Sequence, residues 1–197
     1  MQERMQQNRQ SILHSARELI AYGGFKEASV QTIAERAGVS TGLVYRYFGS
    51  KNKILIEVLS AAIRHEVEIL NQIVKMDLSA KQKLEKSVAT FVKRAMHSPQ
   101  LAYSLIFEPV DSEMEHARFQ SKQLIKQTIQ EVLAEGKNNG TFTFEDINIA
   151  ALGIVGAMTF VVIEPLNPSH NVVFDQAYID HFVQQIADFC VNAVQRP

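Results

Sequence analysis

The sequence predicts an all-α protein, with three short helices within residues 1–53 and a larger helical domain over residues 54–197. Apolar residues recur every three or four positions in almost every segment, which is the period of a helix that buries one face. No segment alternates apolar and polar residues over a length typical of a strand. The chain has 197 residues, of which 46% are apolar and 21% charged, so it is long enough to bury a core and is unlike disordered or collagen-like chains.

Glycine and serine residues delimit the first four helices. The apolar face of the first helix consists of Ile12, Leu13, Ala16, Leu19 and Ile20, and Gly23-Gly24 ends it. Ser29 is a good N-cap for a second helix, which has Val30, Ile33, Ala34 and Ala37 inward and stops at Gly38. Ser40 caps a third helix, which runs to about Phe48. Gly49-Ser50 then caps a long fourth helix with an apolar stripe of Ile54, Leu55, Val58, Leu59, Ala62 and Ile63.

Five further helices are expected, at about 80–97, 99–107, 112–137, 145–163 and 175–194. Ser98-Pro99 separates the first two, and the glycine- and asparagine-rich segment 136–140 is a turn. Residues 164–168 contain two prolines and therefore end the helix 145–163.

The stretch 149–163 is apolar on nearly all sides, which is compatible with a membrane span or with a buried helix. Its 15 residues fall short of the roughly 18 that a bilayer needs, and Glu145, Asp146 and Glu164 flank it closely. This pattern favours a helix buried on all sides, in a core or at a subunit interface.

The charges are unevenly distributed along the chain. The net charge is −1, but residues 1–53 hold eight basic and four acidic side chains, which gives +4 there and −5 for the rest. A cationic N-terminal quarter suggests a polyanionic partner such as nucleic acid. The single Cys190 excludes an internal disulfide, and no signal peptide is recognisable, so we expect a cytoplasmic protein without membrane association.

The second and third helices, with the tight turn at Gly38 between them, have the arrangement of a helix-turn-helix. Val39, Val44 and Phe48 form the inward face of the third helix, so its outward residues are Gly42, Leu43 and Arg46, flanked by Tyr45 and Tyr47. A solvated face normally carries Lys, Glu or Gln. Glycine inside a helix costs about 1 kcal/mol relative to alanine, although less in the first turn, where Gly42 lies. This face is therefore suited to close approach by DNA.

The candidate DNA-binding residues have distinct chemistries. Hydroxyl groups at helix N-termini and tyrosine hydroxyls suit phosphates, a leucine suits a thymine methyl, and an arginine suits guanine or a phosphate. Lys51 adds its charge at the start of the fourth helix, and the first turn of the second helix is able to reach the flanking backbone or one base. The full set is Ser29, Gln31, Thr32, Ser40, Thr41, Gly42, Leu43, Tyr45, Arg46, Tyr47 and Lys51.

These residues resemble the N-terminal domain of TetR-family transcriptional regulators. The resemblance covers about residues 9–56 and lies in the runs 29–34, 38–40 and 44–48, in Ser50-Lys51 and Leu55, and in the preceding Gly23-Gly24-Phe25. It implies that DNA is contacted by Ser40, Thr41, Gly42, Leu43, Tyr45, Tyr47 and Lys51. It also implies that residues from about 57 onward form a helical ligand-binding and dimerisation domain. Tyr47 and Gly49 depart from the family, which often has His at the first position and Pro or Lys at the second.

The last two long helices are the candidates for a dimer interface, where two helices from each subunit would form a four-helix bundle, as the family does. One offers a small-residue face and the other a broad apolar face. The expected interface residues are Ala150, Gly153, Gly156, Ala157, Tyr178, Phe182, Ile186, Phe189, Cys190 and Ala193. The alternative is that both helices only fill the core of their own subunit.

The middle helices offer an apolar pocket with a few polar groups, which would suit a small lipophilic ligand. The candidate ligand-binding residues are Phe91, Tyr103, Phe107, His116, Phe119, Gln123 and Phe160. The alternative is that these aromatic residues are ordinary core residues.

No cofactor, metal site or catalytic constellation is expected. The six histidines are scattered, and no phosphate loop, dinucleotide fingerprint or nucleophile motif occurs. We therefore expect a non-enzymatic, homodimeric regulator, most simply a repressor that a small effector releases from a palindromic operator on double-stranded DNA. The alternatives are a constitutive or partner-regulated DNA-binding protein without a pocket, and a helical enzyme with a vestigial helix-turn-helix.

Overall fold

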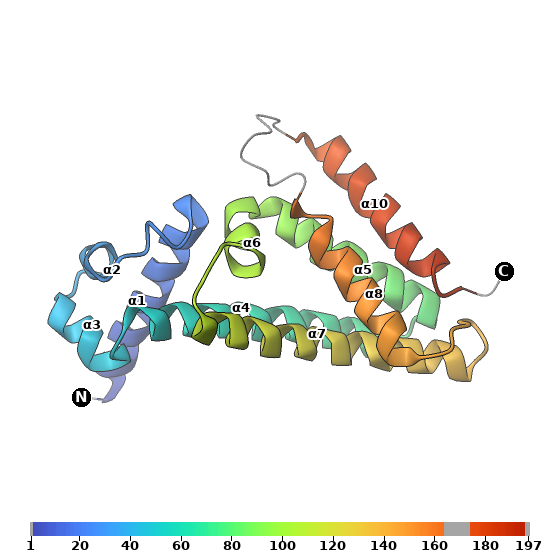
Figure 1. Cartoon of the computed structure of the whole chain (residues 1–197), viewed down its shortest axis with the longest axis horizontal. Coiled ribbons are helices and arrows are strands. Elements are labelled where there is room, and N and C mark those ends of the chain that lie inside the picture. Colours follow the sequence, from blue (N-terminus) through green and yellow to red (C-terminus); the bar gives the residue numbers. More distant parts are fainter. Residues whose placement is uncertain (1, 164–173, 196–197) are drawn as a thin grey trace. The chain divides into compact units, whose positions relative to one another are not determined.

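The computed structural model describes residues 2–163 and 174–195, and within these ranges it confirms the all-α class (Figure 1). The only extended pairing there is an isolated bridge between Phe142 and Gln195. The helices are α1 Gln2–Gly23, α2 Val30–Ala37, α3 Thr41–Phe48, α4 Lys51–Val74, α5 Ala80–His97, α6 Pro99–Ile106, α7 Ser112–Asn138, α8 Ile147–Phe160 and α10 Gln176–Asn192. The predicted break at 164–168 lies outside the described residues.

The predicted caps define the N-terminal helices. The hydroxyl oxygen of Ser29 accepts a hydrogen bond from the Thr32 amide at 3.1 Å, and that of Ser40 accepts one from the Leu43 amide at 3.2 Å. Gly38 ends α2 in the left-handed conformation, with φ of 67°. These contacts satisfy backbone groups that the helix ends would otherwise leave without partners.

The described chain divides into two compact units. The first comprises residues up to Ala62 together with Ser98–Phe119, and the second comprises Ile63–His97 together with residues from Gln120 onward. The N-terminal unit thus includes α6 and the start of α7, which the sequence pattern does not associate with the first three helices.

In the first unit, α1 is the central helix, because it packs against both α2 and α6 (Figure 1). The guanidinium of Arg9 lies 5.0 Å from the centroid of the Phe48 ring and forms an ion pair with Glu57. One side chain of α1 therefore contacts both the last residue of α3 and the first half of α4.

In the second unit, α5 packs against α8 and α10, but α8 is covered on one side only. Its buried residues are Ala151, Ile154, Val155, Met158 and Thr159. On its other side, Ile149 is 71% exposed and Leu152 is 62% exposed. The core of a single chain therefore does not bury α8 on all sides, and burial of its other face at a subunit interface stays a prediction. An apolar residue facing a core and one facing a subunit interface look alike in sequence.

Among the described helices, none combines the length and apolar character that crossing a bilayer requires.

Two buried serines in helices allow a matched test of hydrogen bonding. The Ser87 hydroxyl in α5 has no hydrogen-bond partner within the described part of the chain, whereas the Ser104 hydroxyl in α6 accepts from the Gln100 amide at 3.2 Å. We expect Ser87→Ala to stabilise the protein by up to about 1 kcal/mol, because an unsatisfied polar group is removed and alanine favours the helix. Ser104→Ala should destabilise it by about 1 kcal/mol. Urea unfolding measures both, and equal effects would contradict this expectation.

Candidate nucleic-acid interface

The pair α2–α3 forms a helix-turn-helix whose turn is only three residues long, Gly38 to Ser40. The Gly38 amide donates to the Glu35 carbonyl at 3.2 Å, and the Val39 amide donates to the Ala34 carbonyl at 3.0 Å. The turn leads directly into the Ser40 cap of α3. The direction in which α3 leaves the turn is therefore fixed by backbone hydrogen bonds.

The structure bears out the predicted faces of α3 at most positions, although Val39, expected inward, and Leu43, expected outward, are both half-buried. Val44 and Phe48 are buried, whereas Thr41, Gly42, Tyr45 and Arg46 are exposed. Tyr45 is 53% exposed, and a Cβ added at Gly42 would meet nothing within 4 Å. The structure thus presents a face with a bare backbone, a tyrosine and a cation to solvent.

The Arg46 guanidinium lies 5.9 Å from the centroid of the Tyr47 ring, at an edge where Leu43 and Tyr47 are half-buried. Such an arrangement is able to offer hydrogen bonds to phosphates or base edges and apolar contact to a thymine methyl.

Four of the predicted DNA-binding residues also make internal hydrogen bonds, one of them being Ser40 through its cap of α3. The Thr32 hydroxyl donates to the Glu27 carbonyl at 2.6 Å and lies 2.9 Å from the Ser29 hydroxyl, so both residues cap α2. The Lys51 ammonium donates to the Phe25 carbonyl at 2.9 Å. Gln31 and Ser40 are exposed.

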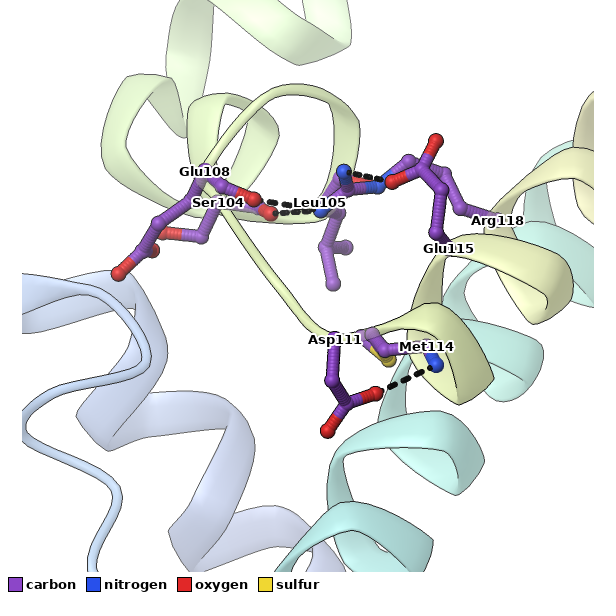
Figure 2. Close-up of polar contacts among 7 residues, drawn as sticks. All are labelled: Ser104, Leu105, Glu108, Asp111, Met114, Glu115 and Arg118. Atoms are coloured by element: carbon purple, nitrogen blue, oxygen red, sulfur yellow. Dashed lines mark hydrogen bonds and ion pairs between the residues drawn. The ribbon is translucent and has the colours of Figure 1, made fainter.

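A cluster between α6 and α7, which sequence patterns do not indicate, lies in the same unit (Figure 2). The buried Arg118 guanidinium donates to the carbonyls of Leu105 at 3.0 Å, Ser104 at 3.3 Å and Glu108 at 2.9 Å, and pairs with Glu115 at 2.7 Å. These carbonyls lie at or just beyond the C-terminal end of α6, where a helix leaves acceptors without internal partners. Three of the four partners of Arg118 are backbone carbonyls, so no pattern of residue types in the sequence indicates the cluster.

Asp111 begins α7 as its cap. Its carboxylate accepts from the Met114 amide at 3.0 Å and from the side-chain amide of Asn52 in α4. The Met114 amide, followed by the Asn52 side chain, holds the pKa of Asp111 below its ordinary value.

A second surface, on α8 and α10, carries most of the predicted dimer residues. Gly153, Gly156, Tyr178, Phe189 and Ala193 are exposed, and Ala150, Ala157, Phe182 and Ile186 are half-buried. The alternative that these two helices only fill their own core is therefore not what the single chain shows. Cys190 is buried, and burial raises the pKa of its thiol to about 11.

A hollow of about 430 Å³ lies between these two helices, with Ile149, Gly153, Ala157, Phe189 and Ala193 among its lining residues.

The seven predicted ligand-binding residues are divided between the two units. Tyr103, Phe107, His116 and Phe119 lie in the first unit, and Phe91, Gln123 and Phe160 lie in the second. Phe119 is 54% exposed and Phe160 is 70% exposed, and none of the seven lines the hollow between α8 and α10. Neither unit by itself brings the seven together.

In the described ranges, no group of three or more His, Cys, Asp or Glu residues is placed to hold a metal ion. His170 lies outside these ranges.

Comparison with known proteins gives a family for the N-terminal helices. The family model described as bacterial regulatory proteins, tetR family, matches residues 12–58. A fatty acid metabolism regulator protein of Bacillus subtilis is 36% identical over 73 residues, which are 37% of this chain and 38% of that protein. The transcriptional regulator SrpR of Pseudomonas putida is 31% identical over 143 residues, 68% of this chain and 63% of SrpR. The chain therefore spans less than two thirds of the length of these relatives.

Solved structures share the whole fold at lower identity. The regulator FadR of Bacillus subtilis, in complex with stearoyl-CoA, has a TM-score of 0.81 at 21% identity, covering 94% of this chain and 99% of FadR. The fatty acid degradation regulator FadR of Bacillus halodurans has a TM-score of 0.81 at 23% identity, covering 96% and 97%. Residues 12–58 are therefore a domain of the tetR family of bacterial regulatory proteins, and the whole chain shares its fold with these solved regulators.

Substitutions at two glycines distinguish an effect on the stability of the fold from an effect on the surface of α3. Gly42→Ala places a methyl group where nothing lies within 4 Å, so thermal stability should be unchanged or higher. We expect DNA affinity to fall about tenfold, because the methyl group stands between α3 and DNA. Gly38→Ala should instead lower the melting temperature, because φ of 67° is unfavourable for alanine. Calorimetry and fluorescence anisotropy with duplex DNA measure both; unchanged DNA binding by Gly42→Ala would contradict the assignment.

Proposed function

We propose that this protein is a homodimeric, sequence-specific DNA-binding regulator of transcription, most simply a repressor, and that a small lipophilic effector releases it from DNA. Each subunit inserts α3 into the major groove of one half of a palindromic operator. The half-sites then lie about one helical turn, or a multiple of it, apart.

The observation that carries this proposal is the exposed face of α3. Gly42, Tyr45 and Arg46 are exposed on a helix that two capped turns and two buried residues hold in place. A glycine without neighbours permits DNA to approach the backbone, and the tyrosine and arginine supply hydrogen bonds to it. The eleven residues predicted from the sequence remain the proposed contact set. Within it, Ser29 and Thr32 also shape α2.

Dimerisation is proposed through α8 and α10. Ile149, Leu152 and Phe189 are each more than 60% exposed, they lie on two helices that pack against each other, and Ile149 and Phe189 line the same hollow. Contiguous apolar surface of this kind marks a site of association in water-soluble proteins. A second copy related by a twofold axis would bury the same face on both subunits and complete a four-helix bundle.

The effector class is proposed from the relatives. One relative is a fatty acid metabolism regulator protein, and one structure with the same fold was solved in complex with stearoyl-CoA. We therefore propose a long-chain fatty acyl group as the lipophilic part of the effector. An effector shifts operator binding only by as much as it prefers the state that does not bind DNA.

The test uses the highest-affinity duplex that the protein selects from a randomised DNA pool, followed by titration with stearoyl-CoA and, as a control, free coenzyme A. We expect a palindromic selected site and at least about tenfold weaker DNA binding at saturating stearoyl-CoA, with no effect of coenzyme A. Stearoyl-CoA binding that leaves DNA affinity unchanged would favour a constitutive or partner-regulated regulator. Failure to select any sequence would remove the DNA-binding proposal.

The dimer surface has a matched pair of leucines. Leu152 on α8 is 62% exposed within the apolar face, and Leu124 on α7 is 45% exposed outside it. Leu152→Glu should give a monomer in sedimentation velocity, because association would bury an unpaired carboxylate. Its DNA affinity should fall by about a hundredfold or more, since two half-sites no longer bind together. Leu124→Glu should remain a dimer, and a dimer for both variants would place the interface elsewhere.

A further inference from the structure

The residue between α6 and α7 that contacts the α1–α2 turn is Glu108. Both of its carboxylate oxygens accept from the Phe25 amide, each at 3.1 Å. The preceding Gly24 has φ of 85°, and a Cβ added there would lie 2.7 Å from a Glu108 oxygen. The carboxylate therefore reaches this backbone at a position that admits no side chain.

The other backbone polar group of Phe25 is also bonded to a charged side chain. Its carbonyl accepts from the Lys51 ammonium at 2.9 Å. An ammonium has three donors, so this bond holds the Lys51 head at a fixed place and leaves two donors for a phosphate. Glu108, Phe25 and Lys51 thus form a continuous chain of hydrogen bonds that ends at a proposed DNA contact.

Glu108 is itself held from two sides. Its backbone carbonyl accepts a hydrogen bond from the buried Arg118 guanidinium at 2.9 Å. The same guanidinium also donates to two carbonyls of α6 (Figure 2). Three residues further on, Asp111 accepts from Asn52, the neighbour of Lys51 in the first turn of α4. The segment that carries Glu108 is therefore attached both to α7 and to the start of α4.

We propose that Glu108 is a positioning residue for DNA binding, acting through the Phe25 backbone on Lys51. The inference rests on the proposed DNA-binding function and assigns part of its affinity to a residue that does not touch DNA. Charge alone predicts the opposite effect, because removing a carboxylate near DNA reduces repulsion of phosphates.

The first experiment compares Glu108→Ala with Glu113→Ala on the duplex selected by the wild-type protein. Both variants lose one carboxylate from the start of α7 or the segment before it, and Glu113 is exposed. We expect Glu108→Ala to bind about tenfold more weakly and Glu113→Ala to bind equally or more tightly. Glu108→Gln retains an acceptor oxygen and should recover part of the affinity, which also guards against a variant that fails to fold.

The second experiment identifies the route through Lys51. In a Lys51→Met background, Glu108→Ala should cause no further loss, because the group that Glu108 positions is absent. Glu108→Ala and Lys51→Met should each reduce the slope of log affinity against log salt by about one. Hydrogen exchange at the Phe25 amide should be faster in Glu108→Ala.

Three results would overturn the inference: equal DNA affinity for Glu108→Ala and Glu113→Ala, an undiminished loss in the Lys51→Met background, or an unchanged salt slope. If the wild-type protein binds no duplex, the proposed function fails and this inference with it. If the wild-type protein binds the duplex but Glu108→Ala binds it as tightly as Glu113→Ala does, the proposed function stands and the positioning role is wrong.

Discussion

The left-handed backbone at Gly38 is the constraint on which the placement of α3 depends. With φ of 67°, this residue ends α2, and its own amide and that of Val39 donate to carbonyls in the last turn of α2. Only Val39 and Ser40 then separate it from α3, so no flexible loop intervenes. Val44 and Phe48 must consequently face the core, and the opposite side of α3 must face outward. A residue with a side chain at Gly38 would strain this geometry without touching any neighbour, because the cost lies in the backbone.

The segment between α6 and α7 holds the N-terminal helices in a different way, with charged side chains bonded to backbone. Arg118 is 5% exposed, and four hydrogen-bonding partners compensate for the burial of its charge. Leaving a buried hydrogen-bonding group without its partner typically costs about 1–3 kcal/mol. The hydrogen bond between Glu108 and Phe25 spans 83 positions in the sequence, and the one between Asp111 and Asn52 spans 59. Their directional geometry therefore fixes α6, α1 and the start of α4 with respect to each other within one unit.

Local signals in the sequence predicted the helices and the outward face of α3, because period, caps and turn glycines act over a few residues. Ser29, Ser40 and Gly38 each took the predicted role. Glu108 and Arg118 were missed because their partners are backbone atoms, which carry no residue type that a pattern could match. The sequence left open whether the chain's own core or a second chain covers Ile149 and Leu152, because an apolar helix looks the same in either case.

The glycines fall into two groups: those that the backbone conformation or packing of this fold requires, and those that it does not. Of the nine glycines, Gly24, Gly38, Gly49 and Gly140 have positive φ, and Gly23 and Gly136 have neighbours that an added Cβ would strike. Gly42, Gly153 and Gly156 have neither feature, although each stands in a helix, where alanine would be favoured by up to about 1 kcal/mol. All three lie on the exposed faces of α3 and α8. Close approach by a second molecule gives a physical reason for a bare backbone there, and DNA for α3 and a second subunit for α8 are the two partners proposed for these faces.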